Sequence, residues 1–415
     1  MSFQTGLSGL SASSQSLDVI GNNIANANTV GMKSSRAEFA DLVASSIGSG
    51  GTSNVAGIGV KLATISQNFS QGNVNITGNT LDVAINGAGF YQLTRTDGTT
   101  AYSRDGQLKL DKSGNIVNNN GSFLMGYPTD INGVTTSTTP QKLSVPTGAP
   151  IAAQQTTNIV AEFNLDARAP VAALQLPPTP RTTYGTAISV FDSQGQPHAL
   201  KLYFERAAPS GAPALDNWNV YTDPSATTQP GAVGVLSFDQ NGVLSTSSTF
   251  PPVGGLTVTP PIGAAVLPFQ VAVDVSGVTQ YGTNFAVSNL SQDGYTSGEF
   301  TGLAIDNKGI ITTRYSNGQT QKSGGMIALA DFRNVQGLSP LGGGEFLESY
   351  KSGAPVLGKP TVGRFGELRS GAVEESNVDL TAELVNMMTA QRNYQANAQT
   401  IKTQDQIMQT IVNLR

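Results

Sequence analysis

The chain has 415 residues, a formal net charge of −5 and 12% charged side chains, which is about half the usual share. So few Lys and Arg residues leave no basic surface for a phosphate backbone, and we expect no nucleic-acid partner. The sequence has no Cys and one His, which excludes disulfides, thiol nucleophiles and Cys- or His-rich metal sites. We therefore expect no metal, no cofactor and no catalytic residue, and we place His198 in a solvated hairpin turn.

The N-terminal segment does not resemble a cleavable secretion signal. Residues 1–32 contain no Lys or Arg and one acidic residue, Asp18, whereas a signal peptide begins with basic residues. The most apolar stretch, residues 253–275, is interrupted by three prolines and cannot form a single spanning helix. We expect no membrane insertion and no cleavable secretion signal.

The first predicted element is an N-terminal helix with the apolar spacing of a coiled coil. Positions that alternate by four and three residues from Phe3 to Ile24 are apolar in five cases of seven. Asn28 and Gly31 are candidates for its end. After this helix, residues 45–59 form a Gly/Ser-rich bridge suited to an extended or mobile connection.

The middle of the chain is predicted to be antiparallel β structure. Eight Asn-Gly or Asp-Gly pairs fall between residues 86 and 318, and these pairs favour tight hairpin turns. Short alternating segments such as 81–85 and 200–204 lie between them. A proline-rich stretch, residues 128–180, indicates a linker into a second β domain.

The C-terminal segment repeats the spacing of the first helix. The same alternation from Leu380 is apolar at eight of ten positions, and Ser376, Asn377 and Asp379 are N-cap candidates. From residue 376 to 415 there are eleven Asn or Gln residues and six charged ones. Amides are enclosed at a smaller desolvation cost than charges, so we favour a helix with neighbours on several sides over a solvated, weakly charged one.

These elements predict a multidomain α+β chain, with long coiled-coil terminal helices and antiparallel all-β domains nested between them. The expected parts are the N-terminal helix and bridge of an inner helical domain (1–70), the two halves of a first β domain (71–147 and 287–363), a second, outer β domain (148–286) and the C-terminal helix (364–415). Because a lone pair of helices has no core of its own, we expect the ends to be largely disordered in the monomer and to fold on association.

Each candidate motif for a chemical site lacks a residue or an arrangement that its chemistry requires. The glycine-rich residues 48–52 lack the Gly-Lys-Ser/Thr ending of a phosphate-binding loop. Asp239 and Asp306 begin segments similar to calcium loops, but neither has a Glu at the twelfth position, so β-turns are the better interpretation. Glu374 and Glu375 are adjacent and point to opposite faces of an extended segment, close enough to the C-terminal helix to favour its dipole.

Two long motifs at the chain ends carry a family resemblance. Residues 22–33, Asn-Asn-Ile-Ala-Asn-Ala-Asn-Thr-Val-Gly-Met-Lys, resemble the N-terminal signature of the bacterial flagellar rod and hook proteins, although Met32 stands where an aromatic residue is common. Residues 376–405 resemble the C-terminal signature, and residues 81–85 and 102–106 resemble the first β domain of that family. The signature residues are Asn22, Asn23, Asn26, Thr29, Gly31, Lys33, Asn377, Asp379, Arg392, Asn393 and Gln395.

Within this family, the chain length and the large second β domain resemble hook members more than the shorter distal rod members. The resemblance implies a homopolymer: a curved, flexible hollow tube that acts as a universal joint between rod and filament. It implies as partners the rod, the hook cap, the hook–filament junction proteins and the flagellar type III export apparatus, with an extracellular location. The apolar seam expected to hold the tube wall comprises Phe3, Leu7, Leu10, Leu17, Ile24, Leu380, Leu384, Met387, Tyr394, Ala398, Ile401, Met408 and Val412.

Three alternatives are considered. The first is a distal rod protein of the same family. The second is a secreted β-rich adhesin or binding protein, which has no need of amphipathic segments at both ends. The third is a carboxylate-based glycosidase, for which the sequence locates no acid pair.

Overall fold

The computed structural model describes residues 2–43, 57–174, 184–211, 214–223, 231–260 and 266–413. The chain forms two compact units. Unit 1 combines residues 1–148, 301–314 and 320–415, and unit 2 combines residues 149–300 and 315–319. The protein is therefore a multidomain α+β chain, in which unit 2 is inserted into unit 1.

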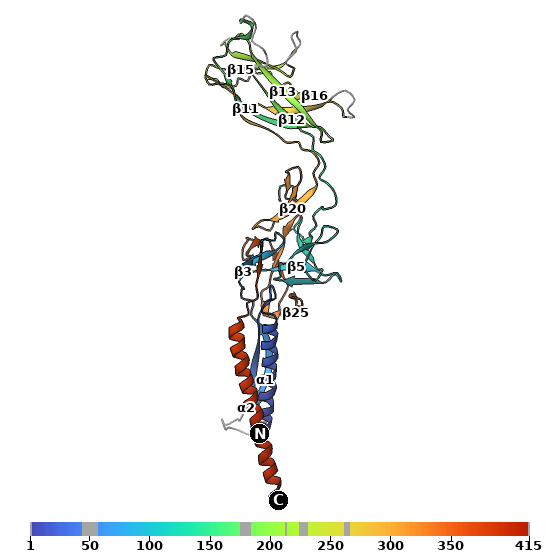
Figure 1. Cartoon of the computed structure of the whole chain (residues 1–415), viewed down its shortest axis with the longest axis vertical. Helices are drawn as coiled ribbons and strands as arrows, with labels where there is room; N and C mark the ends of the chain where they lie inside the picture. The colour runs from blue at the N-terminus through green and yellow to red at the C-terminus, as the bar shows by residue number, and fades with distance from the viewer. Residues whose placement is uncertain are drawn as a thin grey trace. The chain divides into compact units, whose positions relative to one another are not determined.

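Two long helices from the chain ends lie side by side in unit 1. They are α1 (Ser2–Ala25) and α2 (Leu380–Asn413) (Figure 1). They run antiparallel, because Gly6 of α1 lies against Ile401 while Asn23 of α1 lies against Glu383. The expected helices at both ends are confirmed.

A pair of strands packs against α1. Strands β1 (Ser35–Val43) and β2 (Gly57–Gln67) are antiparallel, and the Val60 amide donates to the Ser8 hydroxyl of α1 at 3.3 Å. Most of the bridge expected at residues 45–59 lies outside the described residues. Its last part, Gly57–Gly59, is extended and forms the beginning of β2.

The remaining strands of unit 1 build its β part. The path of the large sheet is β25 (Ser339–Gly342), β26 (Glu345–Leu347), β6 (Thr100–Ser103), β5 (Phe90–Thr94), β9 (Phe123–Tyr127), β8 (Ile116–Val117) and β7 (Lys109–Leu110). Its side partners are β10 (Gln141–Lys142), β23 (Met326–Ile327), β24 (Leu329–Asp331) and β27 (Val356–Gly358). Smaller pairings join β4 (Val83–Asn86) to β28 (Glu367–Ser370), β3 (Val74–Ile76) to β29 (Ala372–Glu374), and β20 (Phe300–Ile305) to β21 (Ile311–Tyr315) and β22 (Thr320–Gln321). Thus the last expected part, residues 364–415, contributes two strands before its helix.

Aromatic side chains fill the core of this β part. Phe90 and Phe346 are buried, and Phe69 packs edge-on against both at ring distances of 5.7 and 5.5 Å. Tyr102 and Phe332 meet edge-on at 4.8 Å. Edge-to-face contacts add to the free energy of burial and fix the relative positions of the strands.

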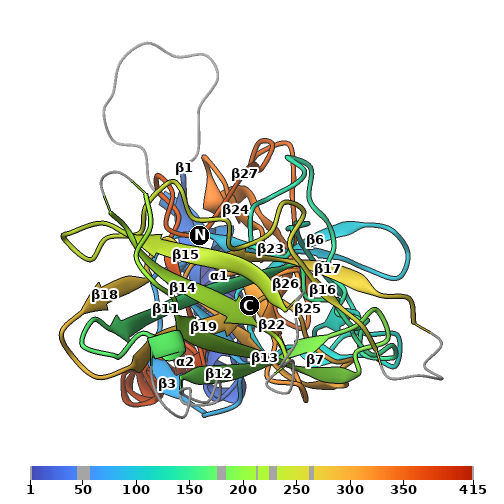
Figure 2. The ribbon, with the colours of Figure 1, turned by 90° about the horizontal axis from the view of Figure 1, so that it is seen from above.

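Unit 2 consists of two sheets packed face to face. One sheet contains β16 (Leu256–Val258), β17 (Phe269–Asp274), β11 (Asn158–Asp166), β18 (Thr279–Tyr281) and β19 (Ala286–Gln292). The other has the order β12 (Gly185–Phe191), β13 (Pro197–Arg206), β14 (Asp216–Tyr221) and β15 (Ala232–Phe238), and its last two strands lie side by side in Figure 2. Phe163 of β11 meets Phe204 of β13 at 4.6 Å between ring centroids, so the inner faces share one core.

Unit 2 departs from the sequence prediction in two ways. The prediction of antiparallel pairing is wrong for β11, whose pairings with β17 and β18 are parallel. Strand β19 occupies one edge of β11 over Ile159–Asn164, so β17 and β18 share the other edge as one broken strand. The boundary expected at residue 286 falls at the start of β19, which pairs within unit 2.

Six hairpin turns share one geometry. In each, a side-chain oxygen of the first residue accepts the backbone amides two and four positions later. The fourth residue is a glycine with φ between 75 and 87°, a left-handed conformation that favours glycine. The first residues are Asp111, Asn118, Asp130, Asp192, Asp239 and Asp306. The β-turn interpretation of Asp239 and Asp306 is confirmed.

Candidate assembly site

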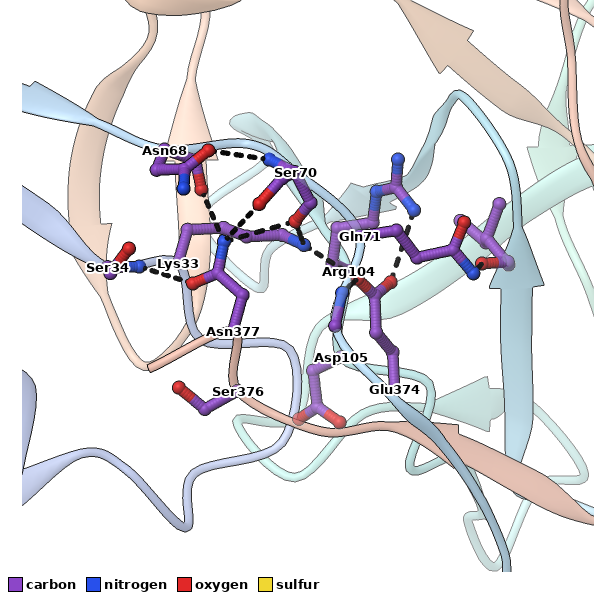
Figure 3. A network of polar contacts seen from close by, with 12 residues as sticks. Lys33, Ser34, Asn68, Ser70, Gln71, Arg104, Asp105, Glu374, Ser376 and Asn377 are labelled. Atoms are coloured by element: carbon purple, nitrogen blue, oxygen red, sulfur yellow. Dashed lines mark hydrogen bonds and ion pairs between the residues drawn. The ribbon is translucent and has the colours of Figure 1, made fainter. Parts of the chain in front are cut away.

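The two chain ends meet at a buried ion network in unit 1. The Glu374 side chain of β29 is fully buried, and its two oxygens accept from two different cations (Figure 3). Lys33 Nζ donates to Oε1 at 2.6 Å, and Arg104 Nη1 donates to Oε2 at 3.1 Å. The carboxylate thus connects the N-terminal signature to the first β domain motif and to the strand that leads into α2.

Backbone groups complete the coordination of this network. Lys33 Nζ also donates to the Ser70 carbonyl at 2.7 Å, and the Gly72 amide donates to Glu374 Oε1 at 2.9 Å. Arg104 Nη2 donates to the Gly87 carbonyl at 2.9 Å. Burial is the main cause that lowers the pKa of Lys33, and Glu374 works against it. The network holds two cations and one anion, so its carboxylate is essential to it.

Two asparagines of the family signatures act as backbone partners. Asn377 Oδ1 accepts the Ser34 amide at 2.7 Å, and its Nδ2 donates to the Asn68 carbonyl at 2.7 Å. Asn23 is buried, accepts the Ser35 amide at 2.9 Å and donates to the Ser35 carbonyl at 2.7 Å. Both amides satisfy backbone groups of the chain that follows α1 and so fix its path.

The glycine of the N-terminal signature is required by two constraints at once. Gly31 has φ +71°, and a Cβ atom at this position would lie 2.6 Å from the Asp105 amide nitrogen. Its own amide donates to the Glu374 carbonyl at 2.8 Å. Gly31 therefore allows the segment before Lys33 to lie directly against the Arg104 loop.

The other signature residues lie on the helices and their ends. Asp379 caps α2, since its Oδ1 accepts the Thr381 and Ala382 amides at 2.9 and 3.1 Å. Asn26 Nδ2 donates to the Asn22 carbonyl at 2.9 Å, and the Thr29 hydroxyl donates to Asn26 Oδ1 at 3.2 Å. The exposed signature residues of α2 are Arg392, Asn393 and Gln395.

The contact line between α1 and α2 is lined by small residues. A Cβ atom on Gly6 would lie 3.2 Å from the Ile401 side chain, and one on Gly9 would lie 2.9 Å from Asn397 Nδ2. Only part of the predicted seam is covered within one chain. Its half-buried members are Leu10, Leu17, Ile24, Met387, Ala398 and Ile401.

The other half of the seam faces outward. Its exposed fraction ranges from 38% at Tyr394 to 69% at Val412. The exposed members are Phe3, Leu7, Leu380, Leu384, Tyr394, Met408 and Val412. A single exposed apolar side chain is ordinary, but seven of them along two neighbouring helices indicate a surface that another molecule covers.

Sequence reasoning missed the centre of the network. Glu374 and Glu375 do face opposite sides, buried and exposed respectively. The expected role of Glu374 beside the helix dipole is not the one it has, because its carboxylate binds Lys33 and Arg104. An acidic residue at the end of a short apolar segment, close to a family signature, was the available signal.

The prediction of a solvated His198 is wrong. Its imidazole is mostly buried in unit 2, and Nε2 lies 2.9 Å from Asp192 Oδ2. Burial favours a higher pKa for Asp192, but the bonds from His198 and from the Gln196 and Gln194 amides outweigh it and hold this pKa below its usual value. The pair closes the first hairpin of the β12–β15 sheet.

Two classes of site are absent from the described residues. No group of three or more His, Cys, Asp or Glu side chains there is arranged to hold a metal ion. Neither helix of the described ranges is long and apolar enough to cross a membrane.

Comparison with known proteins places this chain in a family. The flagellar hook protein FlgE of Salmonella typhimurium is 41% identical over 430 residues, covering all of both chains. The chain belongs to the flagellar hook protein family. The FlgE of Treponema pallidum is 32% identical, over 99% of this chain and 98% of that protein. The expected family resemblance is confirmed, and this family is a structural one.

Family models match the separate parts. They describe a flagella basal body rod protein (residues 3–33), a flagellar hook protein FlgE/F/G D1 domain (84–160), a flagellar basal body protein FlaE D2 domain (164–295) and a flagellar basal body rod FlgEFG protein C-terminal region (369–414). The crystal structure of Helicobacter pylori flagellar hook protein FlgE2 is 14% identical, with a TM-score of 0.52 over 72% of this chain and all of that one. That similarity supports the fold alone.

Proposed function

We propose that this protein is the structural subunit of the bacterial flagellar hook and polymerises through its terminal helices. The observation that carries the proposal is the row of exposed apolar residues on α1 and α2, in a chain of the hook protein family. Copies pack these helices as a coiled-coil wall around a hollow core. The wall belongs to a curved, flexible tube that joins rod to filament.

The energetics favour covering this row. A Leu or Met side chain that is half exposed gains roughly 1 kcal/mol when it becomes fully buried. Each copy in the polymer gains this burial free energy at exposed residues such as Leu7, Leu384 and Met408. Identical contacts that repeat head to tail without closing produce an open helical polymer, which is the form a tube requires.

The ion network gives the tube wall a fixed attachment to the β part of unit 1. Glu374 precedes α2 and binds Lys33, which follows α1, and Arg104 of the β part, so both helices are held at their bases. In the proposed layout, α1 and α2 form the inner layer, the β part of unit 1 forms the first β domain, and unit 2 (149–300 and 315–319) forms the outer domain. Force on the wall then reaches the first β domain through these bonded contacts.

The same layout implies the partners and the location. The rod, the hook cap, the hook–filament junction proteins and the flagellar type III export apparatus are the proposed partners, outside the cell. A distal rod protein is the second candidate. Full-length similarity to hook proteins favours the hook.

The test is electron microscopy of the purified chain under polymerising conditions. The wild-type chain should form tubes, and Leu384→Asp should not, because burying an unpaired carboxylate costs several kcal/mol. Thr400→Asp adds the same charge at an exposed polar position of α2 and serves as the control. Tubes formed equally by Leu384→Asp would refute the role of the seam.

A further inference from the structure

The helix pair has an unpartnered end. Because Gly6 lies opposite Ile401 and the helices are antiparallel, the first residue of α1, Ser2, lies opposite about residue 405 of α2. Residues 405–413 therefore continue beyond α1 for about 13 Å, as Figure 1 shows at the lower end of α2. Ile407, Met408 and Val412 on these turns have exposed fractions of 48, 54 and 69%.

The opposite end of the same helix pair carries a groove. A cavity of about 710 Å³ lies between α1, α2 and the ends of β1 and β2. Its lining mixes apolar and polar side chains, among them Ser16, Val19, Ile20, Asn386 and Ala390. The Gln67 side chain also lines it, and its buried Oε1 has no hydrogen-bond partner. A buried acceptor without a donor costs free energy until a partner supplies one.

We propose that this groove binds the unpartnered end of α2, residues 405–413, from a second copy of the chain. This inference rests on the proposed polymer and names one of its contacts. The end supplies apolar side chains for Val19, Ile20 and Ala390. It also supplies amide donors, Gln406 and Gln409, for Gln67 Oε1.

The groove and the end of α2 lie so far apart in one chain that the contact must repeat from copy to copy. The groove is centred near residues 386–390 and the donated end near residue 409, which lie about 30 Å apart on one straight helix. A chain cannot fill its own groove with its own α2 end. Each copy therefore gives its end to one neighbour and receives the end of another, and such a head-to-tail contact propagates along the helix axis.

Disulfide trapping tests the contact, because the sequence contains no Cys and gives no background. The variant Asn386→Cys/Gln409→Cys should form a covalent ladder when polymers are oxidised. Within one chain, these positions are far beyond the reach of a disulfide. The control, Gln399→Cys/Gln409→Cys, places the first Cys on α2 outside the groove and should give no ladder.

A second measurement tests the same contact by blocking the groove with a large side chain instead of trapping it with a disulfide. Ser16→Trp fills the groove and should raise the concentration needed for polymerisation about tenfold or more, which corresponds to a loss of about 1.4 kcal/mol. Ser11→Trp adds the same side chain at an exposed site of α1 outside the groove and should polymerise as the wild type does.

The outcomes separate this inference from the proposed function. Polymers that form without a ladder from Asn386→Cys/Gln409→Cys, or that form equally well from Ser16→Trp, would overturn the groove contact alone. A wild-type chain that forms no polymer at all would overturn both.

Discussion

A buried carboxylate defines the position of its partners more narrowly than an apolar contact does. Glu374 accepts from Lys33, Arg104 and the Gly72 amide, each along its own direction. Apolar side chains can slide by an ångström at little cost, whereas these bonds lengthen and weaken. These bonds therefore fix the relative positions of four chain segments that are separate in the sequence.

The network predicts a large effect of one substitution. Glu374→Gln leaves two buried cations without an anion, so we expect unit 1 to lose about 3–5 kcal/mol of unfolding free energy. Calorimetry of the full chain should show one transition shifted down. The transition of unit 2, assigned from the fluorescence of the single tryptophan, Trp218, should stay in place.

The adjacent residue provides the matched control. Glu375→Gln removes the same charge from an exposed side chain, and its expected effect is within about 0.5 kcal/mol. If both variants shift unit 1 equally, the network does not stabilise the fold.

The Asp192–His198 pair predicts a pH dependence in unit 2. The pKa of Asp192 is lowered in the folded state, against an unfolded value of about 3.9. Its ionised form therefore stabilises unit 2 above about pH 4, and this contribution is lost as the pH falls through the folded value. Urea unfolding followed by Trp218 fluorescence should show wild type more stable than Asp192→Asn at pH 7, with the difference shrinking toward pH 2. A difference that stays constant over this range would contradict the linkage.

Single residues show where sequence reasoning succeeds and where it stops. Gly31, Lys33 and Asn377 were identified through their motifs, and all three contact the network or its surroundings. The role of Glu374 was not identified, because its place at the end of a short apolar segment does not show which residues its carboxylate binds. Its partners are 341 and 270 residues away in the chain.

At the scale of elements, the helices were predictable and their contact face was not. The alternation by four and three residues gave both helices, yet the face of α2 that contacts α1 includes Asn397, which is outside the predicted seam, beside Ile401. A periodic pattern of apolar residues identifies the helix face that becomes buried, but it does not identify the element or molecule that buries it. Here glycines of α1 let the backbones approach, and seven of the thirteen predicted seam side chains stay exposed.

This arrangement predicts opposite behaviour for two glycines of α1. Gly9→Leu places a side chain where Asn397 already lies, forces the helices apart and should lower the temperature at which polymers dissociate. A Cβ atom on Gly21 would meet nothing within 4 Å. Gly21→Ala should keep or raise that temperature, since Ala favours a helix over Gly by about 1 kcal/mol. Equal effects of both variants would show that the close approach is unimportant.

The β elements show which turn signals are informative. Asn-Gly pairs located three of the six repeated turns, at Asn120, Asn132 and Asn241, whereas the signal common to all six is Asp or Asn three residues before Gly. The β1–β2 pair was missed because residues 35–43 do not alternate cleanly between apolar and polar. The parallel pairing of β11 also leaves no local mark, since it depends on which edge a distant strand occupies.

At the scale of the whole molecule, nesting places the helices of both chain ends in one unit. The chain leaves unit 1 after residue 148 and returns to it at 301, so both termini stay together while the inserted unit 2 has its own core. Helical patterns at both ends with β signals between them predicted this nesting. The point of return did not follow from composition, because β19 has a polar, exposed sequence and belongs to unit 2 only through its pairing with β11.

The nested design separates the cores, which are complete in one chain, from the helix pair, which is not. The last prediction concerns this difference. Ordering a backbone costs about 1–2 kcal/mol per residue, and α1 and α2 leave half of their apolar seam uncovered. Amide hydrogen exchange should therefore find Ser2–Ala25 and Leu380–Asn413 weakly protected in dilute monomer and strongly protected in polymer. Strands β11 and β13 are the internal control, since their protection should be high in both states. Equal, strong protection of the helices in dilute monomer would mean that one chain stabilises them alone, and association would then add contacts without completing the fold.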